Sequence, residues 1–378
     1  SVTIAANDEF EILIDRDAGT MIWKQNASTI ATRTGVPATN ELFFVASGYN
    51  SAVRLIDFGQ TSYVPSDISY LPLNSANLYA NDPPAIEDGS AHFQTALHTG
   101  TGSALTINQT GNSTFTPDFV WTKGRSGATD HILSNVISGT GKYLKSNSTA
   151  AETTDAQALT AFGAGSISYG TLAAANTNAA TYVDWMWKAN AAGVANADGS
   201  ISSTVSANTT AGFSVVTYTG TGSAATVGHG LGVAPSMIIV KERSPGGDDW
   251  YVYHASLTSA DYYVMLNRTD AQGSGSMWNN TAPTSSVFSL TSYIGVNASG
   301  STYVAICFAP TASFSAISAY TGNGSADGPF IYTGFKPAFV LIKRTDVGND
   351  WNIHDAVRDP YNLTSKYLSA NNSGAEDN

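Results

Sequence analysis

Three copies of one strand-and-turn pattern constrain this fold more than any other feature of the chain. They begin at Phe93, Phe213 and Phe314, with the sequences FQTALHTGTGSA, FSVVTYTGTGSA and FSAISAYTGNGSA. A second element follows each copy, a proline that opens an apolar run ending in lysine: PDFVWTK, PSMIIVK and PAFVLIK. Elements that recur in a fixed order are the signature of a tandem repeat. The chain is therefore built by copying one unit.

Two further elements mark the ends of the copies. The segment KYLKSNS at 142–148 recurs as DYYVMLN at 261–267 and KYLSANN at 366–372. A fourth element, TYVDWMWK at 181–188, recurs as TYVAICFA at 302–309, but the third copy has no counterpart. A domain without its last strands would leave a core face open. We therefore expect a longer natural chain and keep, as the alternative, a different C-terminal partner that completes the fold.

Alternating apolar residues predict that each repeat is built from strands. Val183, Trp185 and Trp187 share one face of their segment, and the same spacing recurs in 302–309. The continuously apolar run MIIVK is typical of a central strand that is covered on both sides. The Thr-Gly turns supply residues for tight hairpins. We predict an all-β protein of tandem antiparallel β-sandwich domains joined by linkers, with a small N-terminal β element.

The repeats set the predicted domain boundaries. An N-terminal β element, a possible anchor, is expected at 1–63, where strand-like runs flank an Asp-Ala-Gly turn. Four prolines between residues 64 and 92 predict an extended connection. The small, polar segment 189–212 is expected to be a linker or an edge strand on the surface. The predicted repeats are 93–188, 213–309 and an incomplete 314–378, the last two separated by a short join at 310–313.

The composition argues against several classes of function. Charged residues make up 12% of the 378 residues and the formal net charge is −12, which disfavours binding to nucleic-acid phosphates. The apolar runs have the length of strands, so we expect no membrane insertion. The single cysteine, Cys307, excludes an intrachain disulfide framework and is expected to be a small buried hydrophobe. No phosphate loop, metal helix or nucleophile motif is present, so we expect no enzyme, cofactor or metal.

One constellation of polar and aromatic residues recurs after each central strand. It can be a hairpin whose charges pair across strands, or a sugar-binding loop in which an aromatic face lies beside charged groups. We favour the structural interpretation, since a feature of the fold repeats in every copy while a binding site need not. The candidate ligand contacts are Lys123, Arg125 and Asp130; Lys241, Arg243, Asp249 and Trp250; and Lys343, Arg344, Asp350 and Trp351.

Residues 93–378 resemble a domain family of bacteriophage structural proteins, found mainly in marine phages. The resemblance lies in the long segment from NADGSISSTV to MIIVKERS, in VNASGSTYVAICFA, and in YTGNGSADGPFIYTGFKPAFVLIKRTD. It implies a β-rich virion protein of the kind that forms tail fibres and other appendages. The family has no established catalytic residues, so none is carried over to this chain.

Together these features predict a phage tail fibre or other projecting appendage on the virion surface. Its N-terminal part would anchor it to other tail or capsid proteins, and its repeats would form a rod. Host surface glycan is an expected ligand, and a homo-oligomer is expected, with a trimer usual for fibres. The alternatives are a capsid decoration or head-fibre protein and, less favoured, a glycan-degrading tailspike enzyme, which needs two carboxylates in one groove.

Overall fold

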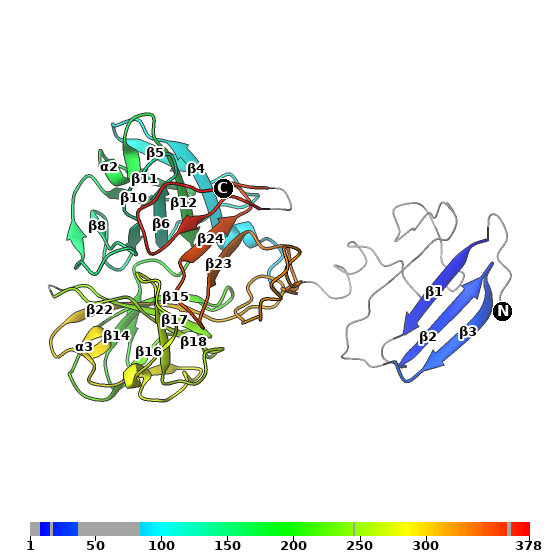
Figure 1. The fold of residues 1–378 in the computed structure, drawn as a ribbon. Helices are drawn as coiled ribbons and strands as arrows, with labels where there is room; N and C mark the ends of the chain where they lie inside the picture. Colours follow the sequence, from blue (N-terminus) through cyan, green and yellow to red (C-terminus); the bar gives the residue numbers. More distant parts are fainter. Residues whose placement is uncertain (1–7, 16–17, 37–83, 245, 361–363) are drawn as a thin grey trace. The chain divides into compact units, whose positions relative to one another are not determined.

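The structure is a computed structural model that describes residues 8–15, 18–36, 84–244, 246–360 and 364–378 (Figure 1). The chain divides into two compact units, Ser1–Pro84 and Ala85–Asn378. In the first unit, β1 (Phe10–Asp15), β2 (Thr20–Gln25) and β3 (Ser28–Thr34) form an antiparallel sheet in that order. These strands lie within the predicted N-terminal β element. The predicted features of residues 37–83 lie outside the described residues.

Repeat one forms two layers of antiparallel strands. Its main sheet has the order β4-β12-β6-β7, with β4 (Phe93–Thr99), β12 (Thr181–Trp187), β6 (Phe119–Gly124) and β7 (Ile132–Asn135). The second layer is β10 (Leu159–Gly163), β11 (Ser166–Tyr169) and β5 (Leu105–Asn108). Val120, Ile167 and Met186 are fully buried in the core between these layers. Shorter elements are η1 (Gly89–Ala91), β8 (Lys142–Tyr143), β9 (Thr153–Thr154) and α2 (Ala173–Asn176).

Repeat two repeats this plan with a wider sheet. The order is β13-β14-β15-β22-β17-β18-β19-β20. The strands are β13 (Val194–Asn196), β14 (Ser203–Asn208), β15 (Phe213–Thr219), β22 (Thr302–Phe308), β17 (Met237–Glu242), β18 (Tyr251–His254), β19 (Tyr262–Met265) and β20 (Gly273–Ser274). The second layer is β16 (Ala225–Gly228) and β21 (Val287–Leu290), with η2 (Ser276–Trp278) and α3 (Ile294–Asn297) beside it.

The segment 189–212, expected to be a linker or an edge strand on the surface, forms the outermost strands at one edge of the sheet. It forms β13 and β14, and β14 pairs along its length with β15. Ile201 and Val205 are buried in the core of repeat two. Most residues of this segment are small or polar, so its sequence shows little apolar pattern, but these two apolar side chains attach it to the sheet.

Repeat three is a single sheet. It consists of β23 (Phe339–Lys343), β24 (Trp351–Asp355) and β25 (Leu368–Ser369), in that order. In the described part of this repeat, no strand corresponds to β12 or β22, and no second layer covers the sheet. Within the described residues, no helix is both long and apolar enough to span a membrane.

The three sheets pack their inner faces against one shared core. This core contains Trp185 of repeat one, Ile239 and Ile306 of repeat two, and Ile353 and Leu368 of repeat three. Figure 1 shows β23 and β24 lying between the sheets of repeats one and two. The all-β prediction is confirmed, but the expected rod of separate sandwiches is not what Ala85–Asn378 forms. In repeats one and two the central strands are apolar on both faces, because one face meets the repeat's own second layer and the other meets the neighbouring repeats.

Candidate functional site

The lysine at the end of each central strand crosses to a neighbouring repeat. Its ammonium group donates a hydrogen bond to a backbone carbonyl there, and the contacts run from repeat two to one, three to two and one to three. They therefore close the three repeats into a ring, and we call each boundary a clasp. The contacts are Lys241 to the oxygen of Thr149 (3.0 Å), Lys343 to that of Thr269 (3.0 Å) and Lys123 to that of Gly374 (2.7 Å).

Two of these lysines are completely buried. Lys123 and Lys241 have no exposed surface, and burial lowers the pKa of each to about 8, although nearby carboxylates oppose the shift. Each ammonium group is also bonded to the carbonyl of the next residue in its own repeat, at 2.8 Å and 2.9 Å. Since buried donors need such partners, these two lysines bind the repeats to each other and have no exposed surface that a ligand could contact.

An arginine and a glutamate strengthen two of the three clasps. Arg125 binds Glu376 through two hydrogen bonds of 2.8 and 2.9 Å, and Arg243 binds Glu152 in the same way at 3.0 and 2.8 Å. Such bidentate pairs are among the stronger charge-assisted contacts. In both clasps the backbone N–H of the glutamate also donates to the carbonyl of the arginine, at 2.9 and 3.0 Å.

The third clasp keeps the backbone contact and replaces both side chains. The N–H of Gln272 donates to the carbonyl of Thr345 at 2.9 Å, so these residues occupy the positions of the glutamate and the arginine. The predicted Arg344 lies one position earlier and takes no part in the clasp. It is exposed and binds Asp346, two residues along the chain, at 2.7 and 3.1 Å.

The predicted tryptophans lie inside the shared core. Trp250 and Trp351 are 0% and 4% exposed, so neither presents a ring face to a sugar. Each indole N–H donates to a carbonyl of the neighbouring repeat, that of Lys145 (2.9 Å) and that of Met265 (2.8 Å). The tryptophans therefore follow the same cyclic order as the lysines.

In repeat one, His131 stands at the tryptophan position. Its Nδ1 accepts a hydrogen bond from Nε1 of Trp121 (2.8 Å), so its Nε2 carries the proton and donates to the carbonyl of Ser369 in repeat three (3.0 Å). Complete burial lowers the pKa of His131 to about 3, and the positive charge of Lys123 adds to the shift. The ring is thus a neutral imidazole that completes the third contact of the cycle.

The predicted aspartates hold the loops of their own repeats. Each accepts a hydrogen bond from an asparagine side chain, whose oxygen accepts from the backbone N–H that follows the aspartate. Asp130 and Asp249 also bind cations, Lys145 and Arg268, at 2.7 and 2.8 Å. The pairs are Asp130–Asn147 (2.8 Å), Asp249–Asn267 (2.7 Å) and Asp350–Asn371 (2.6 Å). All three carboxylates therefore have partners within their own repeats, but none of these partners is a lysine or arginine of the predicted constellation.

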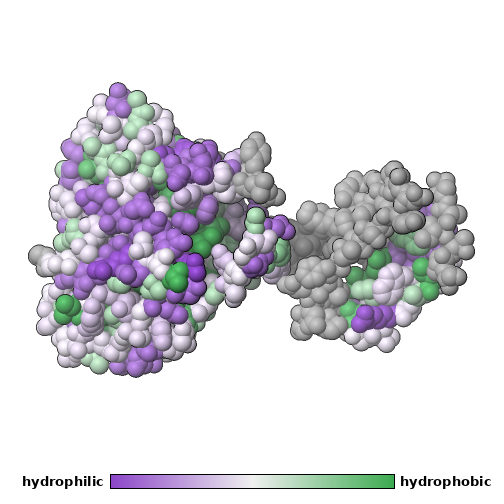
Figure 2. Space-filling model, viewed as in Figure 1, coloured by the Kyte–Doolittle hydropathy of each residue, from purple (hydrophilic) through white to green (hydrophobic). Residues whose placement is uncertain are grey.

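An open, polar hollow lies where the loops of the repeats meet. Asp249 and Arg268 of repeat two line it together with Thr149 of repeat one and Asn371 of repeat three. The charged groups of this hollow are already paired with each other. In the part of the chain that the structure describes, no three or more His, Cys, Asp or Glu side chains are grouped to hold a metal ion. Figure 2 shows hydrophilic residues across the middle of this unit's described surface.

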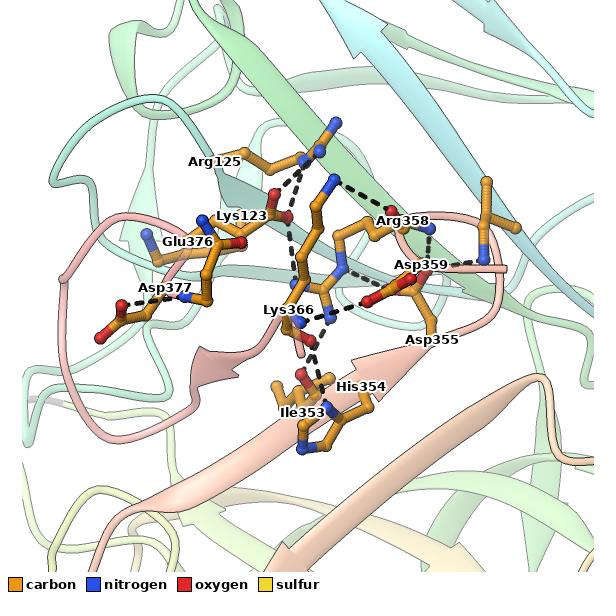
Figure 3. Close-up of polar contacts among 12 residues, drawn as sticks. Lys123, Arg125, Ile353, His354, Asp355, Arg358, Asp359, Lys366, Glu376 and Asp377 are labelled. Carbon is orange, nitrogen blue, oxygen red and sulfur yellow. Dashed lines mark hydrogen bonds and ion pairs between the residues drawn. The ribbon is translucent and has the colours of Figure 1, made fainter. Parts of the chain in front are cut away.

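A buried ionic cluster that no sequence pattern indicated joins repeat three to repeat one (Figure 3). The guanidinium group of Arg358 is fully buried and binds Asp355, the carbonyl of Ile353 (2.9 Å) and Glu376 (3.3 Å). Nε1 of Trp185 in repeat one donates to Asp355 at 3.0 Å, and the guanidinium lies 5.5 Å from the tryptophan ring centroid. This clasp is consequently the most highly charged of the three.

Repeat one also contains a buried polar network of its own. Nδ1 of His98 lies 2.6 Å from Asp184, which accepts from the hydroxyl of Thr122 at 2.6 Å, and Nε2 lies 2.9 Å from the carbonyl of Ala175. Burial alone would lower the pKa of His98, but the hydrogen bond and charge of Asp184 outweigh it and raise this pKa. Both ring nitrogens are occupied, so His98 cannot act as a general base from this position. Tyr218, Ala305 and Val240 stand at the corresponding positions of repeat two.

The described geometry therefore binds the repeats to one another. The predicted lysines, two of the three arginines and both tryptophans meet across repeat boundaries, while the aspartates and Arg344 make contacts within a repeat. Cys307 lies fully buried, as expected, and burial raises the pKa of its thiol to about 12. A thiol with so high a pKa is not a reactive nucleophile at neutral pH.

Comparison with known proteins gives a family but no function. No curated protein and no solved structure matches the chain. Residues 88–378 match the model of a family described as a domain of unknown function, DUF7483. The matched range covers the whole clasped ring of repeats. The chain therefore belongs to the DUF7483 family.

Proposed function

We propose that the protein is a structural component of a bacteriophage virion, most simply a tail fibre or another appendage used in host attachment. The observation that carries this proposal is the ring of clasps. The repeated polar and aromatic residues, which could have formed a ligand site, are bound to neighbouring repeats instead. The arrangement supports a mechanical role rather than a chemical one.

Two further features support a place on the particle surface. The resemblance of residues 93–378 to phage structural proteins implies such a place. A closed all-β unit, held by buried ions and a continuous core, also suits a protein that must persist outside a cell. We assign attachment to other virion proteins to the separate unit Ser1–Pro84, and contact with host glycan to the exposed surface of the ring.

A capsid decoration or head-fibre protein is the second candidate. The observation that favours it is the compactness of Ala85–Asn378, because three repeats in one ring would stud a shell more readily than they would lengthen a fibre. A tailspike enzyme has less support. The polar hollow has two carboxylates, Asp249 and Asp270, but both lie beside Arg268, at 2.8 and 4.0 Å, whereas glycoside hydrolysis uses two carboxylates that flank the substrate.

Immunogold electron microscopy of intact virions tests the proposal. The antibody is raised against the full chain and selected on the folded protein, because the inner faces of the repeats are buried. Gold at the tail tip or along tail fibres supports the attachment role and would lead to host-glycan binding assays. Gold distributed over the head supports the decoration protein instead. Virions that bind no gold, while the purified protein does, contradict both assignments.

A further inference from the structure

The open polar hollow described above takes its lining from all three repeats. Asp249, Arg268 and Asp270 come from repeat two, Thr149 from repeat one and Asn371 from repeat three. Its volume is about 400 Å³, within the range of roughly 300–1,000 Å³ that is typical of small-ligand sites. Every side chain of the lining is polar, so hydrogen bonds must provide most of the contact with a ligand there.

Two exposed charged residues of the hollow occur in repeat two alone. The asparagine that binds the loop aspartate, Asn267 in repeat two, makes the same two hydrogen bonds in every repeat and so marks one equivalent position. Arg268 follows it directly, and Asp270 lies two residues further on. The same positions are uncharged in the other repeats: Ser148 and Ala150 in repeat one, Asn372 and Gly374 in repeat three. Those repeats form the same loop without the charges, so the fold does not require Arg268 or Asp270.

Arg268 is fixed at one nitrogen and open at the other two. Its Nε donates to the buried Asp249 at 2.8 Å, and Asp249 also accepts from the amide of Asn267 at 2.7 Å. Nη1 lies 4.0 Å from the carboxylate of Asp270, beyond hydrogen-bond distance. Among the described residues, neither the terminal nitrogens of Arg268 nor the carboxylate of Asp270 have a hydrogen-bond partner. The hollow thus presents a held guanidinium group beside a carboxylate, with donors and acceptors unused.

Uncharged groups from the three repeats add further donors and acceptors. Thr149 and Thr269 are exposed, and their carbonyl oxygens bind the clasp lysines, but their hydroxyl groups have no partner within the described ranges. Asn267 and Asn371 each use one amide N–H for a loop aspartate, which leaves the second N–H of each amide. The lining therefore mixes hydrogen-bond donors and acceptors over a short distance.

This lining suits one class of ligand better than the others. An anion is disfavoured because two carboxylates, Asp249 and Asp270, face a single guanidinium group. A metal ion is disfavoured because Arg268 lies beside both carboxylates of the described lining. An uncharged sugar fits, since each of its hydroxyl groups both donates and accepts, and planar guanidinium and carboxylate groups can each bind two neighbouring hydroxyls.

We propose that the hollow binds a neutral saccharide unit of a host surface glycan. Arg268 donates to hydroxyl groups of the sugar and Asp270 accepts from them, while Thr149 and Asn371 contact it from the adjacent repeats. Because the hollow is open, the rest of the glycan chain can extend away from the protein. The inference deepens the proposed attachment function and rests on it for the source of the saccharide.

The test uses the purified full chain and four neutral probes, the methyl glycosides of glucose, galactose, mannose and N-acetylglucosamine. Saturation-transfer difference NMR detects binding, titration gives the affinity, and sulfate is the anionic competitor. We expect at least one glycoside to bind saturably and sulfate at the same concentration to leave it bound.

Variants that copy repeat one locate the binding. Arg268→Ser and Asp270→Ala each introduce the residue of repeat one at the same position, and each should lower the affinity about tenfold by removing charged hydrogen-bonding groups. Arg344→Ser and Asp346→Ala are the matched controls and should leave the affinity unchanged. These two residues have the same spacing in the sequence, are exposed and ion-paired, and lie outside the lining of the hollow.

Unchanged thermal unfolding of the variants shows that they fold. The proposal is overturned if none of the four glycosides binds, if Arg268→Ser and Asp270→Ala bind as tightly as the wild type, or if sulfate displaces the sugar. The result is separable from the virion assignment, because the binding assay uses the purified chain and immunogold microscopy uses the particle. A chain that binds no glycoside can still be located on virions, and a chain that binds one but is absent from virions contradicts the virion role alone.

Discussion

Acid should loosen the ring at the boundary between repeats one and three, through His131. The neutral ring donates to the carbonyl of Ser369 and accepts from Trp121, so a proton added to Nδ1 would destroy the second contact. The pKa of His131 is about 3 in the folded protein and about 6.5 in an unfolded chain. Between these values the unfolded state binds more protons, so the free energy of unfolding decreases as the pH falls. From pH 7 to pH 5 the loss is about 2 kcal/mol, at roughly 1.4 kcal/mol for each pH unit below 6.5.

Urea unfolding at pH 7 and pH 5 measures this loss in the wild type and in His131→Gln, which keeps a polar side chain at the position without a titrating group. The wild type should lose about 2 kcal/mol more than the variant over this interval. His254→Gln is the matched control. His254 is only partly buried and its ring contributes no contact to a clasp, so this change should alter the pH dependence less. If His131→Gln and the wild type lose the same free energy of unfolding, the imidazole does not titrate as the buried contact requires.

Three further predictions concern the polar contacts of the ring, each measured by urea or thermal unfolding. Lys241→Ala should lower the free energy of unfolding by about 2–4 kcal/mol, because it removes buried packing and two hydrogen bonds, whereas the more exposed Lys343→Ala should cost about 1 kcal/mol; equal costs would contradict the burial argument. Arg243→Thr and Glu152→Gln copy the third clasp, and each alone should lower the free energy of unfolding by about 2 kcal/mol. The double variant should be about 1 kcal/mol more stable than the sum of the two losses predicts, whereas strict additivity would show that the pair is not coupled. His98 has a raised pKa, so its stabilisation should be fully present below about pH 6.5 and lost as the pH rises through the folded value; His98→Gln should not show this loss as the pH rises from about 6.5.

Local sequence pattern was sufficient for the strands and insufficient for their assembly. The apolar alternation of 181–188 and 302–309 predicted β12 and β22, and the continuous run MIIVK correctly indicated a strand covered on both faces. What covers the second face depends on contacts between different repeats, such as that of Trp351 with Met265, and no local period encodes these. The expected rod does not form because the main sheets of the three repeats share one core.

The clasp lysine could have been recognised from the sequence. Phe119, Trp121 and Lys123 alternate along one strand, so the lysine shares the face of two large apolar side chains and must be buried with them. It counts among the predicted ligand contacts, although charged residues are seldom fully buried and a buried lysine has no surface to offer to a ligand. Arg358 offered no such signal, since it has no counterpart in the other repeats and its partners Asp355 and Glu376 are brought together only by the fold.

The clasps imply that the ring of three, and not the single repeat, is the folding unit of Ala85–Asn378. The two residues of each clasp pair come from different repeats. In the third clasp both of them are replaced together, the arginine by Thr345 and the glutamate by Gln272. Heterologous contacts of this kind either continue as an open array or close after a fixed number of copies. Here they close, because Lys123 of repeat one donates to the carbonyl of Gly374 in repeat three. The lysine of a fourth repeat would need that same carbonyl. The three repeats of Ala85–Asn378 therefore form a closed set of contacts to which a fourth repeat cannot be added in the same way.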